Sequence, residues 1–235
     1  MNNKELLEQF EGLSTPLIAD ACLRLKVPLR LAPPGVKTWL ENPHIAGNAL
    51  PARHYGSVDI FLEALSLANP GDVLVVDNQG RLAEACIGDL IALEARSQGL
   101  AAIFVWGAHR DTDELLQIGL PIFSYAAFPA GPRRLDLREP EALISARIGD
   151  FWVTQADVFF GDSDGVIFVS GAQVEDVLQE ALSIWKKERQ QAQAVRTGTT
   201  LREQLHFEQY LQRRGVEPGY SFRQHLRNLG RAIEE

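Results

Sequence analysis

Hydrophobic residues at helical spacing open the chain. Leu6, Leu7, Phe10 and Leu13 recur three or four positions apart, which predicts a helix, and Ser14-Thr15-Pro16 supplies a cap and an early proline for a second one. Four prolines in residues 27–44 predict a loop or extended segment. After it, IAGNALPARHY predicts a strand with a glycine irregularity over 45–55, and the next apolar periodicity predicts a helix over 58–68.

Short apolar runs alternate with helical segments in the middle of the chain. VLVVD (73–77), AAIFVW (101–106) and PIFSY (121–125) predict buried strands, with helices at 89–98 and 112–119 between them. This alternation predicts parallel strands. The later runs at 146–153, 157–162 and 165–170 are separated by short turns and predict hairpins. The expected fold is therefore α/β with a mixed sheet.

A helical pattern fills the chain after residue 171. We expect an α/β domain over residues 1–170 and a helical C-terminal extension over 171–235. Two apolar helical faces in this extension require a partner, for which a neighbouring subunit is the simplest candidate. These faces consist of Phe207, Tyr210 and Leu211, and of Phe222, Leu226 and Leu229.

Charge and composition narrow the class of protein. The net charge of −8 argues against bulk nucleic-acid binding, although residues 186–235 carry +4 and the rest of the chain −12. That basic tail could touch RNA or pack on the acidic body of a neighbouring subunit, and its interleaved apolar residues favour packing. Two cysteines are too few for a disulfide framework. No apolar run approaches a membrane span and no secretory signal is evident, so we expect a cytoplasmic protein.

Charged residues follow the predicted strands. Asp77 ends one strand, Asp89 begins a helix after Gly88, and Arg110-Asp111 follow AAIFVW closely. The carboxyl ends of parallel strands meet at one edge, where ligands bind. A helix start offers free N–H groups to an anion, arginine grips a carboxylate, and aspartate is a hard ligand for Mg²⁺. The alternative is that Asp89 is a helix cap and Arg110 forms a surface ion pair.

Other chemical motifs are absent or ambiguous. There is no GxGxxG, Walker or nucleophile-elbow pattern, and no lysine lies in residues 38–185, so a Schiff-base aldolase is hard to place. His109 is either a proton carrier or, more often in such a position, a packing residue. His54 follows a strand and could face the cleft. Asp162-Ser-Asp164 resembles a calcium loop but is more typical of a hairpin turn.

An ordered set of short motifs resembles a known family. LSTPLIADA, IAGNALPAR, PGDVLVVD, Asp89 with twenty intervening residues before Arg110-Asp111, LPIF and GDSDGV occur in sequence over residues 14–170. The set resembles the RraA-like family of divalent-metal-dependent pyruvate aldolases, related to 4-hydroxy-4-methyl-2-oxoglutarate/4-carboxy-4-hydroxy-2-oxoadipate aldolase. The same family contains the regulator of ribonuclease E activity A. Residues 126–140 and the long tail depart from the pattern.

The resemblance implies a fold and a site. The fold would be an α-β-β-α sandwich of the swivelling-domain type. Asp111 would bind Mg²⁺ or Mn²⁺, with Asp89 acting through water. The substrate carboxylate would rest on Arg110 and on the amides of Leu90 and Ile91 after Gly88. Glu188 of a neighbouring subunit is a candidate to complete the water shell of the metal.

The resemblance also implies an activity and an assembly. The enzyme would cleave a 4-hydroxy-2-oxo acid into pyruvate and a carbonyl product, with oxaloacetate decarboxylation as a side activity. It would form a trimer or a pair of trimers with sites between subunits. Two alternatives stay open: a non-catalytic regulator that binds a ribonuclease or another protein, and an isomerase or other lyase acting on a 2-oxo acid. The identity of the 2-oxo acid does not follow from the sequence.

Overall fold

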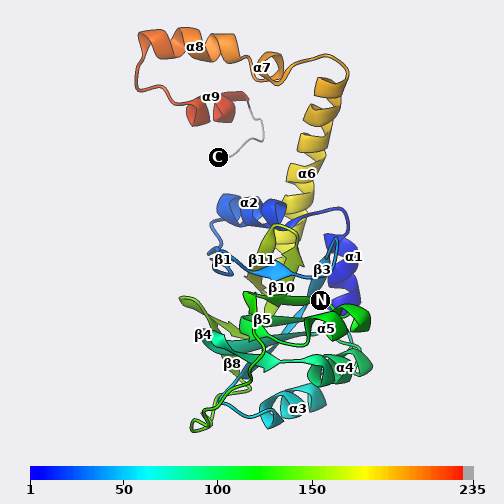
Figure 1. Cartoon of the computed structure of the whole chain (residues 1–235). Helices are drawn as coiled ribbons and strands as arrows, with labels where there is room; N and C mark the ends of the chain where they lie inside the picture. Colours follow the sequence, from blue (N-terminus) through cyan, green and yellow to red (C-terminus); the bar gives the residue numbers. More distant parts are fainter. Residues whose placement is uncertain (230–235) are drawn as a thin grey trace.

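The computed structural model describes residues 1–229 and consists of an α/β body from which C-terminal helices project (Figure 1). The helices are α1 (Asn3–Phe10), α2 (Thr15–Leu25), α3 (Asp59–Ser66), α4 (Asp89–Ser97), α5 (Thr112–Ile118), α6 (Val174–Arg196), α7 (Leu201–Gln204), α8 (Phe207–Val216) and α9 (Phe222–Leu229). The strands are β1 (Arg30–Leu31), β2 (Lys37–Thr38), β3 (Ile45–Arg53), β4 (Val73–Ile87), β5 (Ala102–His109), β6 (Ile122–Ser124), β7 (Ala126–Ala127), β8 (Ser145–Ile148), β9 (Phe151–Thr154), β10 (Asp157–Asp162) and β11 (Gly165–Ser170).

The described strands form one nine-stranded sheet and one separate hairpin. The main sheet has the order β1-β11-β10-β3-β4-β5-β6-β2, with β7 paired to β5, and β8 pairs only with β9. Strands β3, β4, β5 and β6 are mutually parallel, whereas β10 and β11 are antiparallel to their neighbours. The prediction of a mixed sheet with parallel strands in the middle of the chain is therefore confirmed.

The two halves of the sheet face each other across an aromatic core. Phe104 on β5 lies 5.7 Å from Phe168 on β11, and Phe123 on β6 lies 5.3 Å from Phe159 on β10, measured between ring centroids. All four rings are buried. Such edge-to-face pairs bury a large apolar area and add specific geometry. Alternation of side chains along each strand leaves the other face of both halves free for helices.

Two further cores lie beneath those helices. On the parallel half, α3, α4 and α5 bury Phe61, Ile91 and Leu115 against Leu74 and Val105. On the antiparallel half, α1, α2 and the first part of α6 bury their own apolar residues against β10 and β11. Helix, sheet, sheet and helix follow in this order, which confirms the predicted α-β-β-α sandwich. The helical extension was expected to begin at residue 171. The first part of α6 instead packs within the body, because Val177 and Ile184 lie in the second of these cores.

Strand β4 is longer than the sequence predicted. We expected a strand at 73–77 followed by a turn at 78–80, but β4 continues to Ile87 and stays paired with β5 through three register shifts. Gln79 and Gly80 adopt left-handed backbone angles, with φ of 57° and 68°. These angles let the extra residues bulge out of the sheet before the chain rejoins β5. The chain does turn at residues 78–80 as predicted, but these residues form a bulge within β4 and do not end the strand.

The C-terminal helices form an arm, which we define as residues 197–229. Its expected apolar faces pack on each other: Phe222 lies 4.9 Å from Tyr210 and 5.6 Å from Phe207, and Leu226 is buried. Phe207, Tyr210, Phe222 and Leu226 thus contact partners within the arm itself, and packing of the arm on another subunit stays a prediction. The arm follows the long helix α6 and stands apart from the α/β body of its own chain (Figure 1). None of the described helices is long and apolar enough to cross a membrane.

The hairpin between β10 and β11 is structural, as its sequence favoured. Buried Asp162 accepts hydrogen bonds from the Thr15 amide at 2.6 Å, the Thr15 hydroxyl at 2.6 Å and the Asp164 amide at 2.9 Å. One carboxylate therefore holds the turn and the start of α2 together. Its acceptor sites are occupied by protein donors, in agreement with a turn and not with a calcium loop.

We predict that Asp162→Ala destabilises the body. The substitution leaves buried donors of Thr15 unpaired, which costs about 3 kcal/mol of the free energy of unfolding. Urea denaturation followed by circular dichroism measures this loss. Asp164→Ala is the matched control, because the Asp164 side chain is exposed, and its effect stays within about 0.5 kcal/mol. Equal stability of the two variants would show that Asp162 does not hold α2.

Candidate functional site

The carboxyl ends of β4 and β5 bring the predicted site residues together. Ile87 is paired with His109 in the parallel register, and the Arg110 amide donates to the Ile87 carbonyl at 2.9 Å. Gly88 is the N-cap of α4, and Asp111 is the N-cap of α5. The twenty residues between Asp89 and Arg110 are thus one helix and one strand that return the chain to the same edge, as predicted.

The Asp111 carboxylate is the centre of this cluster. Its Oδ2 atom accepts from Arg110 Nε at 3.3 Å and from the Asp89 amide at 3.3 Å. A Cβ atom on Gly88 would lie only 2.4 Å from the same oxygen. Glycine is therefore needed at position 88 for space, while its own φ of −139° is open to any residue. The four residues Gly88, Asp89, Arg110 and Asp111 are the site cluster.

Asp111 also has an unusual backbone. Its φ of 60° and ψ of 43° place it in the left-handed region, which a non-glycine residue enters at a cost. Such strain persists only where the surrounding structure holds it, and it concentrates at functional sites. The side chain is one-third exposed, and that of Arg110 about half exposed, so a ligand can reach both. The Arg110–Asp111 ion pair of the alternative interpretation is present, whereas the N-cap of α4 is Gly88 and not Asp89. The role of these residues in binding a ligand stays a prediction.

The first turn of α4 supplies a further part of the cluster. Asp89 Oδ1 accepts from the Leu90 amide at 2.8 Å, so one of the two predicted carboxylate-binding amides is engaged by the protein itself. The Ile91 amide, also in the first turn, has no intrahelical acceptor. The Leu90 side chain is strongly exposed, whereas Ile91 is buried in the core under α4. Burial of Ile91 fixes the start of the helix beside Asp111.

His109, which precedes Arg110, is a buried residue next to the site cluster. It is fully buried, with Nδ1 2.7 Å from Ser124 Oγ and Nε2 3.0 Å from Thr112 Oγ1. Burial lowers the pKa of its imidazole, which favours the neutral ring. Because both nitrogens are hydrogen-bonded to hydroxyl groups, neither is available to a substrate at Asp111. Of the two interpretations of His109, proton carrier and packing residue, the structure favours the packing residue.

Other expected residues lie outside the cluster. Asp77 is buried, and its carboxylate accepts from the Gln79 amide at 2.8 Å and from the Arg147 amide at 3.0 Å. Burial raises the pKa of this carboxyl. Glu188 lies on α6, 4.0 Å from Arg189 and beyond Ile184, the last buried residue of that helix. It is not brought to the cluster of its own chain, and its role in a neighbouring subunit stays a prediction.

The position of residues 128–141, which we define as the strap, was not predicted from the sequence. The strap crosses the strand ends, with the Ala85 amide donating to the Ala130 carbonyl at 2.9 Å. A Cβ on Gly131 would lie 3.5 Å from Arg110 Nη1, so the strap runs beside the site cluster. Arg134 anchors it through Glu84 at 2.9 Å. The irregular, proline-containing sequence predicted a loop here but not where the loop packs.

A metal at this site would depend on few protein ligands. Within residues 1–229, no group of three or more His, Cys, Asp or Glu side chains is arranged to hold an ion. Asp89 and Asp111 are nevertheless two hard carboxylates at the adjacent starts of α4 and α5, with the Asp89 amide 3.3 Å from Asp111 Oδ2. This donor set is compatible with Mg²⁺, which keeps several waters and takes one or two carboxylates.

Comparisons with known proteins agree with this architecture. Residues 15–168 match the RraA-like family, described as Aldolase/RraA. A Halalkalibacterium halodurans protein named "Putative 4-hydroxy-4-methyl-2-oxoglutarate aldolase" is 29% identical over 178 residues, which cover 75% of this chain and 82% of that protein.

Two solved structures share the fold. An uncharacterized Pseudomonas syringae protein superposes with a TM-score of 0.75 at 22% identity, over 85% of this chain and 96% of that one. Streptomyces coelicolor RraAS2, described as an unusual member of the RNase ES inhibitor RraA protein family, superposes with a TM-score of 0.69 at 22% identity, over 79% and 94%. With the family match spanning most of the body and its motifs meeting at one edge, the chain belongs to the RraA-like family.

Proposed function

We propose that the protein is a divalent-metal-dependent lyase that cleaves a 4-hydroxy-2-oxo acid into pyruvate and a carbonyl product. The observation that supports this most is the site cluster, where a carboxylate, a guanidinium and a helix start meet because Gly88 has no side chain to push the carboxylate away. The aldolase names of relatives at modest identity agree with it. Decarboxylation of oxaloacetate passes through the same enolate and is the expected side activity.

The side chains have distinct roles in this proposal. The Arg110 guanidinium and the Ile91 amide bind the carboxylate of the 2-oxo acid, where the positive end of α4 also favours an anion. Asp89 accepts the proton of the 4-hydroxyl group through a water molecule, as a general base. Asp111, with Asp89 through water, would hold Mg²⁺ or Mn²⁺. When bound, the cation supplies positive charge where the enolate develops.

Loss of Asp111 is predicted to abolish most of the activity. Asp111→Asn removes the charge that would hold the metal and should lower kcat/KM for pyruvate release by about 100-fold. The assay couples pyruvate to lactate dehydrogenase, with oxaloacetate and a series of 4-hydroxy-2-oxo acids, with Mg²⁺ and with EDTA. Asp113→Asn, at an exposed acid in the first turn of α5, is the control and should behave as wild type. A wild-type protein that binds Mg²⁺ but turns over none of these acids would refute the proposal.

Position 88 offers a test of the cluster geometry. Gly88→Ala places a methyl group against Asp111 Oδ2, so the carboxylate must move, and kcat/KM should fall by about 100-fold. Isothermal titration should show weaker Mg²⁺ binding in the same variant. Gly131→Ala is the matched control, since its methyl group would sit at an ordinary 3.5 Å from Arg110. Full activity in Gly88→Ala would mean that Asp111 is not confined as described.

We also propose that the arm packs on a neighbouring subunit of the same chain. Its separation from the body and the positive charge of residues 186–235 against the acidic remainder support this. Truncation after residue 197 is predicted to leave the body folded but to reduce the oligomer, which we expect to be a trimer or hexamer. Light scattering coupled to size exclusion measures the mass. An unchanged number of subunits would exclude this role for the arm.

A non-catalytic regulator is the second candidate. The RNase-inhibitor description of the Streptomyces coelicolor structure and the projecting basic arm favour it. Such a protein would bind a ribonuclease through the arm and keep an idle site. Robust turnover that depends on Asp111, with no effect on ribonuclease activity, would favour the lyase.

A further inference from the structure

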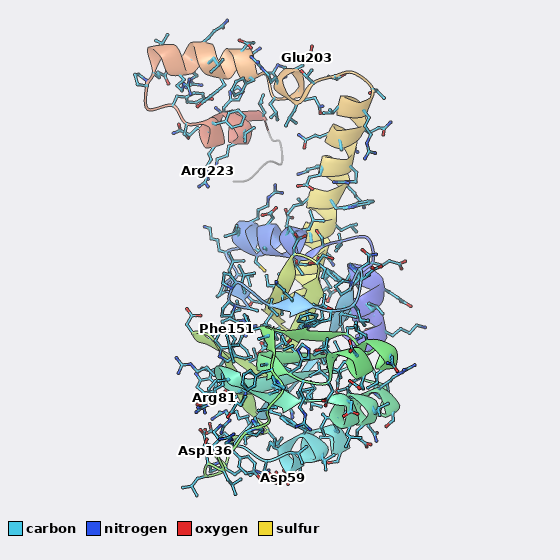
Figure 2. All side chains as sticks on the ribbon, viewed as in Figure 1. Asp59, Arg81, Asp136, Phe151, Glu203 and Arg223 are labelled. Carbon is cyan, nitrogen blue, oxygen red and sulfur yellow. The ribbon has the colours of Figure 1, made fainter. Side chains whose placement is uncertain are left out.

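A cavity at the other side of the strand ends is not explained by the proposed lyase. It has a volume of about 450 Å³ and lies between the end of β3, the bulge of β4 after Asp77, Trp106 of β5, the β8–β9 hairpin and the strap. It shares no lining residue with the site cluster. Asp136, one of its lining residues, lies at the end of the body opposite the arm residues Glu203 and Arg223 (Figure 2). The volume is in the usual range for small-molecule sites.

His54 presents an unpaired acceptor to this cavity. The residue is 4% exposed, and its ring stacks on the buried ring of Phe61 at 5.2 Å. Its Nδ1 lies 2.9 Å from Asn78 Oδ1, which also accepts from Arg134 Nη2 at 2.9 Å. Arg134 Nη2 also lies 3.4 Å from His54 Nδ1, and Asn78 Nδ2 has no partner among the described residues. Because the arginine can only donate, the oxygen of Asn78 faces it, and the shorter 2.9 Å contact of Nδ1 with that oxygen assigns the proton to Nδ1.

The tautomer of His54 decides whether its Nε2 atom accepts or donates a hydrogen bond. With Nδ1 protonated and burial lowering its pKa, the imidazole is neutral, and Nε2 carries a lone pair. Nε2 has no hydrogen-bond partner among residues 1–229. Since His54 lines the cavity and its Nδ1 is bound to Asn78, Nε2 is the ring nitrogen left for a ligand. An unpaired acceptor at a cavity wall is matched by a donor such as a hydroxyl group.

Arg147 is the available cation of the cavity wall. Its Nε donates to the Gly149 carbonyl at 3.1 Å, and no carboxylate of the described residues forms an ion pair with it. The other charges are engaged: Arg53 pairs with Glu139, Asp136 pairs with Arg134, and Asp77 accepts from backbone amides. A carboxylate is the anion that a free guanidinium binds with two parallel hydrogen bonds.

Two indole rings complete the wall. Trp106 and Trp152 both line the cavity, and Trp152 is half exposed. The Arg53 guanidinium covers the Trp152 ring at 4.5 Å and holds it in place. Apolar aromatic surface with a few convergent polar groups is typical of a specific small-molecule site. A ligand that satisfies all three features has a carboxylate, hydroxyl groups and an apolar C–H face.

We propose that this cavity binds a small polyhydroxylated carboxylic acid, a sugar acid, with its carboxylate on Arg147 and a hydroxyl group donating to His54 Nε2. The site does not depend on the metal or on Asp111, so it stands or falls separately from the proposed lyase activity.

Three six-carbon probes separate the contributions. D-gluconate has both a carboxylate and hydroxyl groups, hexanoate lacks the hydroxyl groups, and sorbitol lacks the carboxylate. Isothermal titration of the full chain in EDTA should show saturable gluconate binding at least about tenfold tighter than that of either other probe. Asp111→Asn should bind gluconate as wild type does. No saturable gluconate binding, or binding lost with Asp111→Asn, overturns the proposal.

Substitutions of residues that line the cavity test where gluconate binds. Arg147→Gln should weaken gluconate binding by about tenfold. Arg133→Gln, an exposed arginine of the strap that does not line the cavity, is the matched control and should have no effect. His54→Phe keeps the stacking on Phe61 and should remove the preference for gluconate over hexanoate. Equal affinities in Arg147→Gln and Arg133→Gln would place the ligand elsewhere and overturn the proposal.

Discussion

Parallel pairing of β4 with β5 is the interaction on which the rest of the structure depends. It places Ile87 opposite His109, so the starts of α4 and α5 lie side by side and Gly88 meets the Asp111 carboxylate. The same two strands contribute to the core beneath their helices and to the aromatic core between the sheet halves. Burial on both faces fixes the register, because a shift of one residue would exchange the two faces of a strand.

Much of the body could be predicted from the chain alone. Apolar runs at 101–106 and 157–170 are bounded by turn signals, and helical periodicity marks α2, α3 and α4. These are local signals, which sequence patterns carry well. The proximity of Asp89, Arg110 and Asp111 followed from one long-range rule, that the carboxyl ends of parallel strands meet, whereas their interpretation as a site came from the family resemblance.

The failures have a common physical cause. The continuation of β4 beyond Asp77 depends on pairing with β5 across a bulge, and local turn residues hide such pairing. The packing of α8 on α9 within the arm, where Tyr210 contacts Phe222, was not predicted. The His54–Asn78–Arg134 network joins three segments that are distant in sequence. Each of these depends on tertiary contacts that no local pattern encodes.

The strand ends therefore support two chemically different regions, the site cluster at Asp111 and the cavity at His54. The central claim is that the cluster stabilises the enolate of pyruvate, whichever carbonyl fragment completes the substrate. Exchange of the pyruvate methyl protons in D₂O, followed by proton NMR, tests that claim without knowledge of the full substrate. We predict exchange that requires Mg²⁺ and is lost in Asp111→Asn. Exchange no faster than in buffer, for protein shown to bind Mg²⁺ and pyruvate, would contradict it.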